Sequence, residues 1–129
     1  MLADDRLFDP DPTQKALAME LYARIRDLPI VSPHGHVEPA LFSDPERRFG
    51  DPVELLIRPD HYVLRMLYSQ GIPYERLLSK AHPRQTWQLF AENFYLFRGT
   101  PSGIWLTHEL EALFGVTEKL TGASASRIY

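Results

Sequence analysis

Apolar side chains recur every three or four residues along most of the chain, a spacing that is typical of amphipathic helices. The first such stretch runs from Pro12 to about Asp27 and ends before Pro29. Asp11 stands where it can cap this helix, and Pro12 suits the first helical position. The apolar positions that support the prediction are Leu17, Ala18, Leu21, Tyr22 and Ile25.

The second half of the chain is predicted to be helical almost throughout. Asp60 is a plausible cap for a helix that Gly71 stops, with Val63, Met66 and Leu67 on its inner face. Two longer helices are predicted to start at Pro83 and, after Thr100, at Pro101. Shorter helical turns are expected near 39–42, 52–57, 73–78 and after Gly122. We expect the apolar stripes of the two longer helices to lie in the core; they comprise Trp87, Phe90, Ala91 and Phe94, and Trp105, Leu106, Leu110, Leu113 and Phe114.

One short stretch favours a strand instead. Ile30 and Val31 form an apolar run that Ser32-Pro33 closes. A lone strand cannot satisfy its backbone groups, and the best second candidate, Leu55–Ile57, is weak. The sequence therefore predicts a mostly α chain with one or a few short strands. We expect it to be the N-terminal piece of a larger α/β protein whose other strands lie outside these residues.

Two histidines follow this predicted strand. His34 and His36 are separated only by Gly35, which has no side chain to obstruct a ligand. Because alternate residues of an extended segment point to the same side, both imidazoles would project together. Neutral imidazoles are metal ligands, so the pair is a candidate half of a metal site at the carboxyl end of a strand. The alternative is a pair of loop histidines that are solvated or bonded to backbone.

Composition narrows the function classes. The 129 residues are 44% hydrophobic and 24% charged, with a net charge of −3, a pI of about 5.9 and no cysteine. The hydrophobic and charged fractions are ordinary for a globular protein. The absence of cysteine excludes disulfides and thiolate metal sites. The sequence has no stripe of basic residues, so we do not expect nucleic acid to be a partner. The acidic N-terminal residues do not resemble a signal peptide and no apolar run is long enough to span a membrane, so we expect a soluble cytoplasmic protein.

The run from Ile30 to Val37 resembles the end of the first barrel strand in the amidohydrolase superfamily. A more specific resemblance, to the N-terminal quarter of the uronate isomerase family, covers most of the chain from about Leu7 onward. The residues that carry it are Asp60-His61-Tyr62 with Arg65, Gly71, Trp87 with Phe90, Gly103-Ile104-Trp105-Leu106-Thr107-His108-Glu109-Leu110, and Phe114-Gly115.

This resemblance implies a fold, a domain organisation and a reaction. The fold would be the N-terminal part of a distorted (β/α)₈ TIM barrel with its inserted helical subdomain. Residues 1–37 would hold the N-terminal helix and first barrel strand, 38–120 the inserted subdomain, and 121–129 the start of a helix returning to the barrel. The family interconverts D-glucuronate with D-fructuronate and D-galacturonate with D-tagaturonate. At full length the resemblance implies a homo-oligomer with a hexuronate substrate.

The resemblance also implies site residues. One divalent ion, zinc, would be held by His34 and His36, and Tyr62 would contact substrate. A tyrosine hydroxyl, with an ordinary pKa of ~10, suits a hydrogen-bond donor or proton relay better than a base. Arg65 lies one turn further on and could meet a uronate carboxylate, although a solvated or ion-paired arginine fits equally well.

Weaker candidates and rival functions stay open. Glu38 and His61 read as surface residues and His108 as a buried core histidine. A second possible function is another metal-dependent hydrolase of the same superfamily. A third is a helical module, without enzymatic activity, whose aromatic faces bind a partner protein. Two imidazoles alone do not make a tight site, so we expect this chain by itself to bind metal weakly and to lack isomerase activity.

Overall fold

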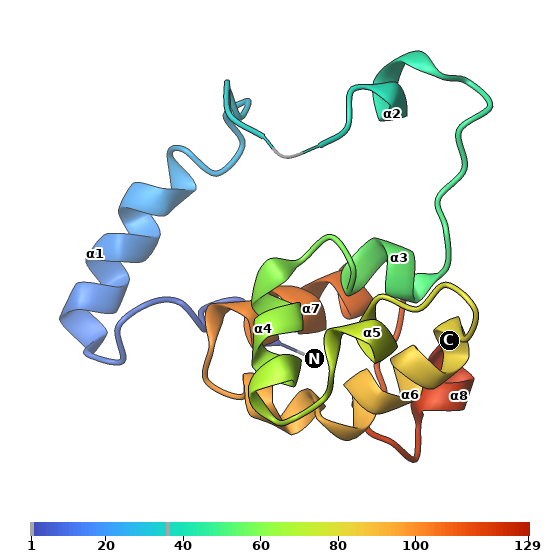
Figure 1. Ribbon diagram of the computed structural model, residues 1–129. Coiled ribbons are helices and arrows are strands. Elements are labelled where there is room, and N and C mark those ends of the chain that lie inside the picture. Colours follow the sequence, from blue (N-terminus) through green and yellow to red (C-terminus); the bar gives the residue numbers. More distant parts are fainter. Residues whose placement is uncertain (1, 36) are drawn as a thin grey trace. The chain divides into compact units, whose positions relative to one another are not determined.

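The computed structural model describes residues 2–35 and 37–129, and every regular element in that part of the chain is a helix (Figure 1). The mostly α prediction is therefore confirmed. Contacts divide the chain into two units, residues 2–47 and residues 48–129, which are described separately below. No helix in the described residues is both long enough and apolar enough to cross a membrane.

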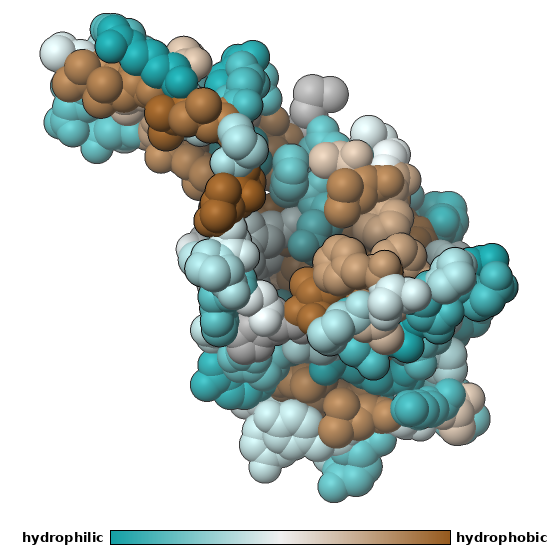
Figure 2. Space-filling view, turned by 90° about the horizontal axis from the view of Figure 1, so that it is seen from above, coloured by the Kyte–Doolittle hydropathy of each residue, from teal (hydrophilic) through white to brown (hydrophobic). Residues whose placement is uncertain are grey.

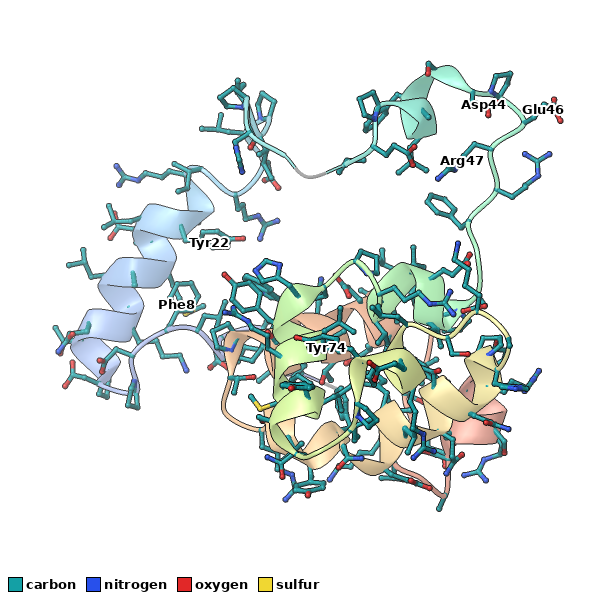
Figure 3. The ribbon with its side chains drawn as sticks, in the orientation of Figure 1. Phe8, Tyr22, Asp44, Glu46, Arg47 and Tyr74 are labelled. Atoms are coloured by element: carbon teal, nitrogen blue, oxygen red, sulfur yellow. The ribbon has the colours of Figure 1, made fainter. Side chains whose placement is uncertain are left out.

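The first unit contains α1 (Pro12–Ala23) and the short α2 (Ala40–Ser43). As predicted, Asp11 caps α1: its carboxylate accepts the backbone N–H groups of Thr13 and Gln14 at 3.0 and 2.9 Å. The residues before α1 fold back along it. Phe8 packs edge-on against Tyr22 with ring centroids 5.9 Å apart (Figure 3), and Lys15 forms an ion pair with Asp5.

No described residue of this first unit is buried. The apolar positions of α1 are exposed, including Leu17 and Leu21 at 58% and 55%. Figure 2 shows such brown side chains on the surface of the segment that holds α1. The helical period of this stretch was predicted correctly, but within residues 2–47 its apolar stripe has no core to cover.

The predicted strand at Ile30 and Val31 is wrong for this chain. Both residues lack regular structure and are 93% and 89% exposed, and no strand occurs among the described residues. A lone strand is unstable because its backbone N–H and C=O groups have no partners, and no strand among the described residues offers such partners to this segment. The second candidate, Leu55–Ile57, lies mostly within a helix.

The second unit is a cluster of short helices. In chain order these are α3 (Pro52–Leu56), α4 (His61–Ser69), α5 (Tyr74–Leu77), α6 (Pro83–Glu92), the 3₁₀ helix η1 (Phe94–Phe97), α7 (Pro101–Ala112) and α8 (Ala125–Ile128). Asp60 caps α4 as predicted, and α7 starts at Pro101 as predicted, with Thr100 as its cap. Gly71 follows α4 with φ of +85°, a conformation that only glycine adopts readily. The helix that starts at Pro83 ends at Glu92, and the side-chain amide of its C-cap residue, Asn93, donates to the carbonyl of Leu89 at 2.8 Å.

An aromatic cluster forms the core of this second unit. Trp87 and Phe90 on α6 are 1% and 0% exposed, and Phe90 meets Phe97 with ring centroids 5.8 Å apart. The indole Nε1 of Trp87 donates to the backbone carbonyl of Ala125 at 2.9 Å, which ties α8 to α6. The predicted core is confirmed at Trp87, Phe90, Ala91, Leu106 and Leu110, and Phe94 is half-buried.

Three residues that were predicted to lie in the core, one on α7 and two just after its end, are instead at the surface. Trp105 is 61% exposed, Leu113 73% and Phe114 51%. Only Leu106 and Leu110 of this helix are buried, and residues one position apart point about 100° from each other. His108, expected in the core, is also exposed.

Candidate functional site

The predicted metal ligands lie in the first unit. His34 is exposed, in a loop where the hydroxyl of Ser32 donates to its backbone carbonyl at 2.9 Å. His36, the other predicted ligand, lies outside the described residues. Glu38 is held by Arg47 at 2.7 Å. Among residues 2–35 and 37–129 no three histidine or carboxylate side chains gather as a metal site would require.

The predicted substrate residues lie in the second unit and share one cavity. It has a volume of about 600 Å³, and we refer to it as the α4–α7 cavity. One wall is a stripe of α4 at positions i, i+3, i+4 and i+7, and the other is the start of α7 with the end of η1. The lining residues are Tyr62, Arg65, Met66, Ser69, Phe97, Thr100, Pro101, Ser102 and Trp105.

The cap of α4 positions the tyrosine wall. Asp60 Oδ1 accepts the backbone N–H groups of Tyr62 and Val63 at 2.8 and 3.2 Å, which fixes the first turn. The guanidinium carbon of Arg65 lies 5.1 Å from the centre of the Tyr62 ring, a cation–π contact one turn along the helix. The centre of the His61 ring lies 4.3 Å from that of the Tyr62 ring. Tyr62 nevertheless remains about half exposed.

A close approach between η1 and α7 positions the opposite wall. The hydroxyl of Thr100 donates to the carbonyl of Phe97 at 2.8 Å and accepts the N–H of Gly103 at 3.1 Å. A Cβ atom at Gly103 would clash with that same carbonyl, so only glycine fits this turn. The tight start of α7 places Ser102 and Trp105 along the cavity.

The charge of the cavity lining favours an anion. Arg65 is its only charged residue, and none of the nine lining residues is acidic. Nearby, on the next turn of α7 after Trp105, the pKa of Glu109 is raised, first by burial and then by the charge of Asp60, with His108 opposing. An aromatic and largely apolar cavity with one cation suits an anionic ligand that also has an apolar face.

A second cavity of about 530 Å³ lies near α3 and α8. Its charged lining residues, Arg127 and Glu118, form an ion pair with each other, which lowers the pKa of Glu118 and raises that of Arg127. Because these charges already neutralise each other, they offer little to a charged ligand. The α4–α7 cavity is therefore the stronger candidate site.

Sequence reasoning found part of this cavity. It selected Tyr62 and Arg65, which the structure brings together, but missed Trp105, Met66 and Ser69. The helical spacing of the α4 stripe was visible in the sequence. It did not show which side of the helix would face a cavity.

Comparison with known proteins identifies relatives along nearly the whole chain. The protein-family model described as glucuronate isomerase matches residues 12–129. The uronate isomerase of Nostoc punctiforme is 53% identical, and the match covers 100% of this chain but 29% of that relative. The uronate isomerase of Caulobacter vibrioides is 49% identical over 95% of this chain and 26% of its own length. The crystal structure of glucuronate isomerase from Caulobacter crescentus superposes with a TM-score of 0.91 at 46% identity, covering 98% of this chain and 28% of that chain.

Proposed function

The chain belongs to the glucuronate isomerase family, and from this premise we propose that it is the N-terminal region of an enzyme that interconverts aldohexuronates and ketohexuronates. The substrate pairs would be D-glucuronate with D-fructuronate and D-galacturonate with D-tagaturonate. The observation that carries the proposal is the family match from residue 12 to residue 129, which includes both units. The relatives compared here are isomerases, so neither a hydrolase nor a binding module is favoured.

The reaction moves hydrogen between two carbons and between two oxygens. From aldose to ketose, C2 loses a hydrogen and C1 gains one, while the proton of the C2 hydroxyl is lost and the C1 oxygen gains one. In our proposal Tyr62 binds the sugar and relays or donates a proton to one of these oxygens, since its hydroxyl is a good donor. Arg65 binds the uronate carboxylate; it is the only cation in a lining without acidic residues.

We propose that His34 and His36 hold one divalent ion, zinc. The donor chemistry fits, because neutral imidazole is a common zinc ligand and His34 is exposed and accessible. A zinc site needs three or four ligands, so the other ligands would come from the rest of the full-length protein. When bound, such an ion polarises an oxygen of the sugar.

The larger fold and assembly are part of the same proposal. Residues 1–37 would supply the first helix and strand of a distorted (β/α)₈ barrel, 38–120 an inserted helical subdomain, and 121–129 the return to the barrel. The exposure of Ile30 and Val31 supports this division, because both are β-branched side chains that neighbouring strands would cover. We further propose a cytoplasmic homo-oligomer at full length.

The test is the activity of the full-length protein. Purified enzyme with zinc is incubated with D-glucuronate or D-galacturonate, and NMR spectroscopy follows the appearance of the ketohexuronate. We expect turnover of at least one substrate, and loss of turnover in His34→Ala and His36→Ala variants that remain folded. A folded, zinc-loaded enzyme that converts neither sugar acid would refute the proposal.

A further inference from the structure

The chain has two tryptophans, and they lie in opposite surroundings. Trp87 is 1% exposed and its indole N–H is bonded inside the core. Trp105 is 61% exposed and lies on the wall of the α4–α7 cavity. The Trp105 side chain offers a large, flat apolar surface on the wall of the cavity, on which a ligand can pack.

The opposite wall supplies the matching charge. The guanidinium carbon of Arg65 lies over the Tyr62 ring, 5.1 Å from its centre. The N–H groups of Arg65 point outward in the guanidinium plane, where they can bind a carboxylate through two parallel hydrogen bonds. Within the described part of the chain, no acidic side chain forms an ion pair with Arg65.

We propose that Trp105 is a substrate-binding residue, on which the C–H face of the sugar acid packs while Arg65 binds its carboxylate. This inference rests on the proposed function, and it adds a residue and a binding mode to the same site. The cavity of about 600 Å³ lies within the usual range for small-molecule sites. Ser69 and Ser102 line it as well; the Ser69 hydroxyl donates to the carbonyl of Met66 at 2.7 Å and can still accept a hydrogen bond from the sugar.

Quenching of tryptophan fluorescence by acrylamide tests this on the full-length enzyme. The difference in quenching between the wild type and Trp105→Phe isolates the contribution of the exposed Trp105. We expect D-glucuronate or D-galacturonate to lower the quenching constant about twofold, since a bound ligand buries most of its own surface against the pocket. D-Glucose, which lacks the carboxylate, and acetate, which lacks the sugar, are expected to leave it unchanged.

Matched arginine variants separate the two parts of the binding mode. Arg65→Gln should abolish protection by the sugar acids, whereas Arg76→Gln, at an exposed arginine of α5 outside the cavity, should keep it. The inference is overturned if neither sugar acid protects Trp105. It is also overturned if glucose protects equally, or if protection persists in Arg65→Gln.

Kinetics of the full-length enzyme distinguish this inference from the proposed function. We expect Trp105→Ala to raise KM about tenfold, equivalent to about 1.4 kcal/mol of binding, with a smaller change in kcat. A wild-type enzyme that isomerises, with an unchanged KM in Trp105→Ala, refutes the role of Trp105 and leaves the proposed function standing. If a sugar acid protects Trp105 but the enzyme shows no isomerase activity, the proposed function is refuted and the binding role of Trp105 stands.

Discussion

Replacing Asp60 tests whether the cap of α4 holds the tyrosine wall of the cavity. Asp60 Oδ1 accepts the backbone N–H groups of Tyr62 and Val63 at 2.8 and 3.2 Å. Those donors have no carbonyl partner within the helix, because they belong to its first turn. Asp60→Ala removes the acceptor, and we expect the free energy of unfolding to fall by about 1 kcal/mol, the usual cost of losing such a cap.

Asp60→Asn is the matched control. Asparagine caps helices about as well as aspartate, so both N–H groups keep an acceptor while the charge is lost. Losing the charge weakens the favourable interaction with the helix dipole, and it also removes the repulsion that contributes to the raised pKa of Glu109. These effects oppose each other, so we expect the free energy of unfolding of Asp60→Asn to lie within about 0.5 kcal/mol of the wild-type value.

Urea unfolding at neutral pH measures the difference. In a Trp105→Phe background, Trp87 is the sole tryptophan and reports on the core of residues 48–129. We expect Asp60→Ala to unfold at a lower urea concentration than Asp60→Asn. Coincident curves for these two variants would show that the cap bonds contribute nothing, and the account of how α4 begins would be refuted.

Three further predictions concern charge, the core and the metal. Because the pKa of Glu109 is raised in the fold, its neutral form is favoured there; the contribution of Glu109 to stability should be fully present below its ordinary pKa of 4.5 and be lost as pH rises through the raised value. Glu109→Gln should flatten this part of a plot of Tm against pH, and an unchanged slope would contradict the prediction. Trp87→Phe removes the indole hydrogen bond to the carbonyl of Ala125, which keeps only the backbone N–H of Tyr129 at 3.1 Å, and should cost about 1 kcal/mol in urea unfolding, with an unchanged midpoint as the contrary result. Zinc titration of the 129-residue chain by calorimetry should give only weak binding, since His34 and His36 are two ligands where three or four are needed; sub-micromolar binding would show a complete site.

Helix beginnings were predicted well because local chemistry decides them. Asp11, Asp60 and Thr100 each accept an N–H group two or three residues ahead, so the capping residue and the first turn are close in sequence. Pro12 and Pro101 occupy the first helical position for an equally local reason. Of the candidate site, Tyr62 and Arg65 were found because they occur in a family motif and lie one turn apart.

The errors concern contacts between distant residues. Ile30 and Val31 have strand-forming side chains, but a strand also needs a partner, and the described residues contain none. In α7 apolar residues occur on nearly every side, so their spacing does not say which face is buried. The packing of α7 against η1 leaves Leu106 buried and Trp105, one residue earlier, on the cavity wall.

The two faces of α4 couple stability to binding. Val63, Leu64 and Leu67 bury one face in the core, while the stripe that includes Tyr62 and Arg65 lines the cavity. A helix fixed on one side by buried side chains, and at its start by a capped turn, presents its other side with little loss of side-chain freedom on binding. The same turn that anchors α4 to the core therefore also sets the spacing of Tyr62 and Arg65 along the cavity. Substitutions at Arg65 should affect binding alone, whereas Asp60→Ala should weaken folding and binding together.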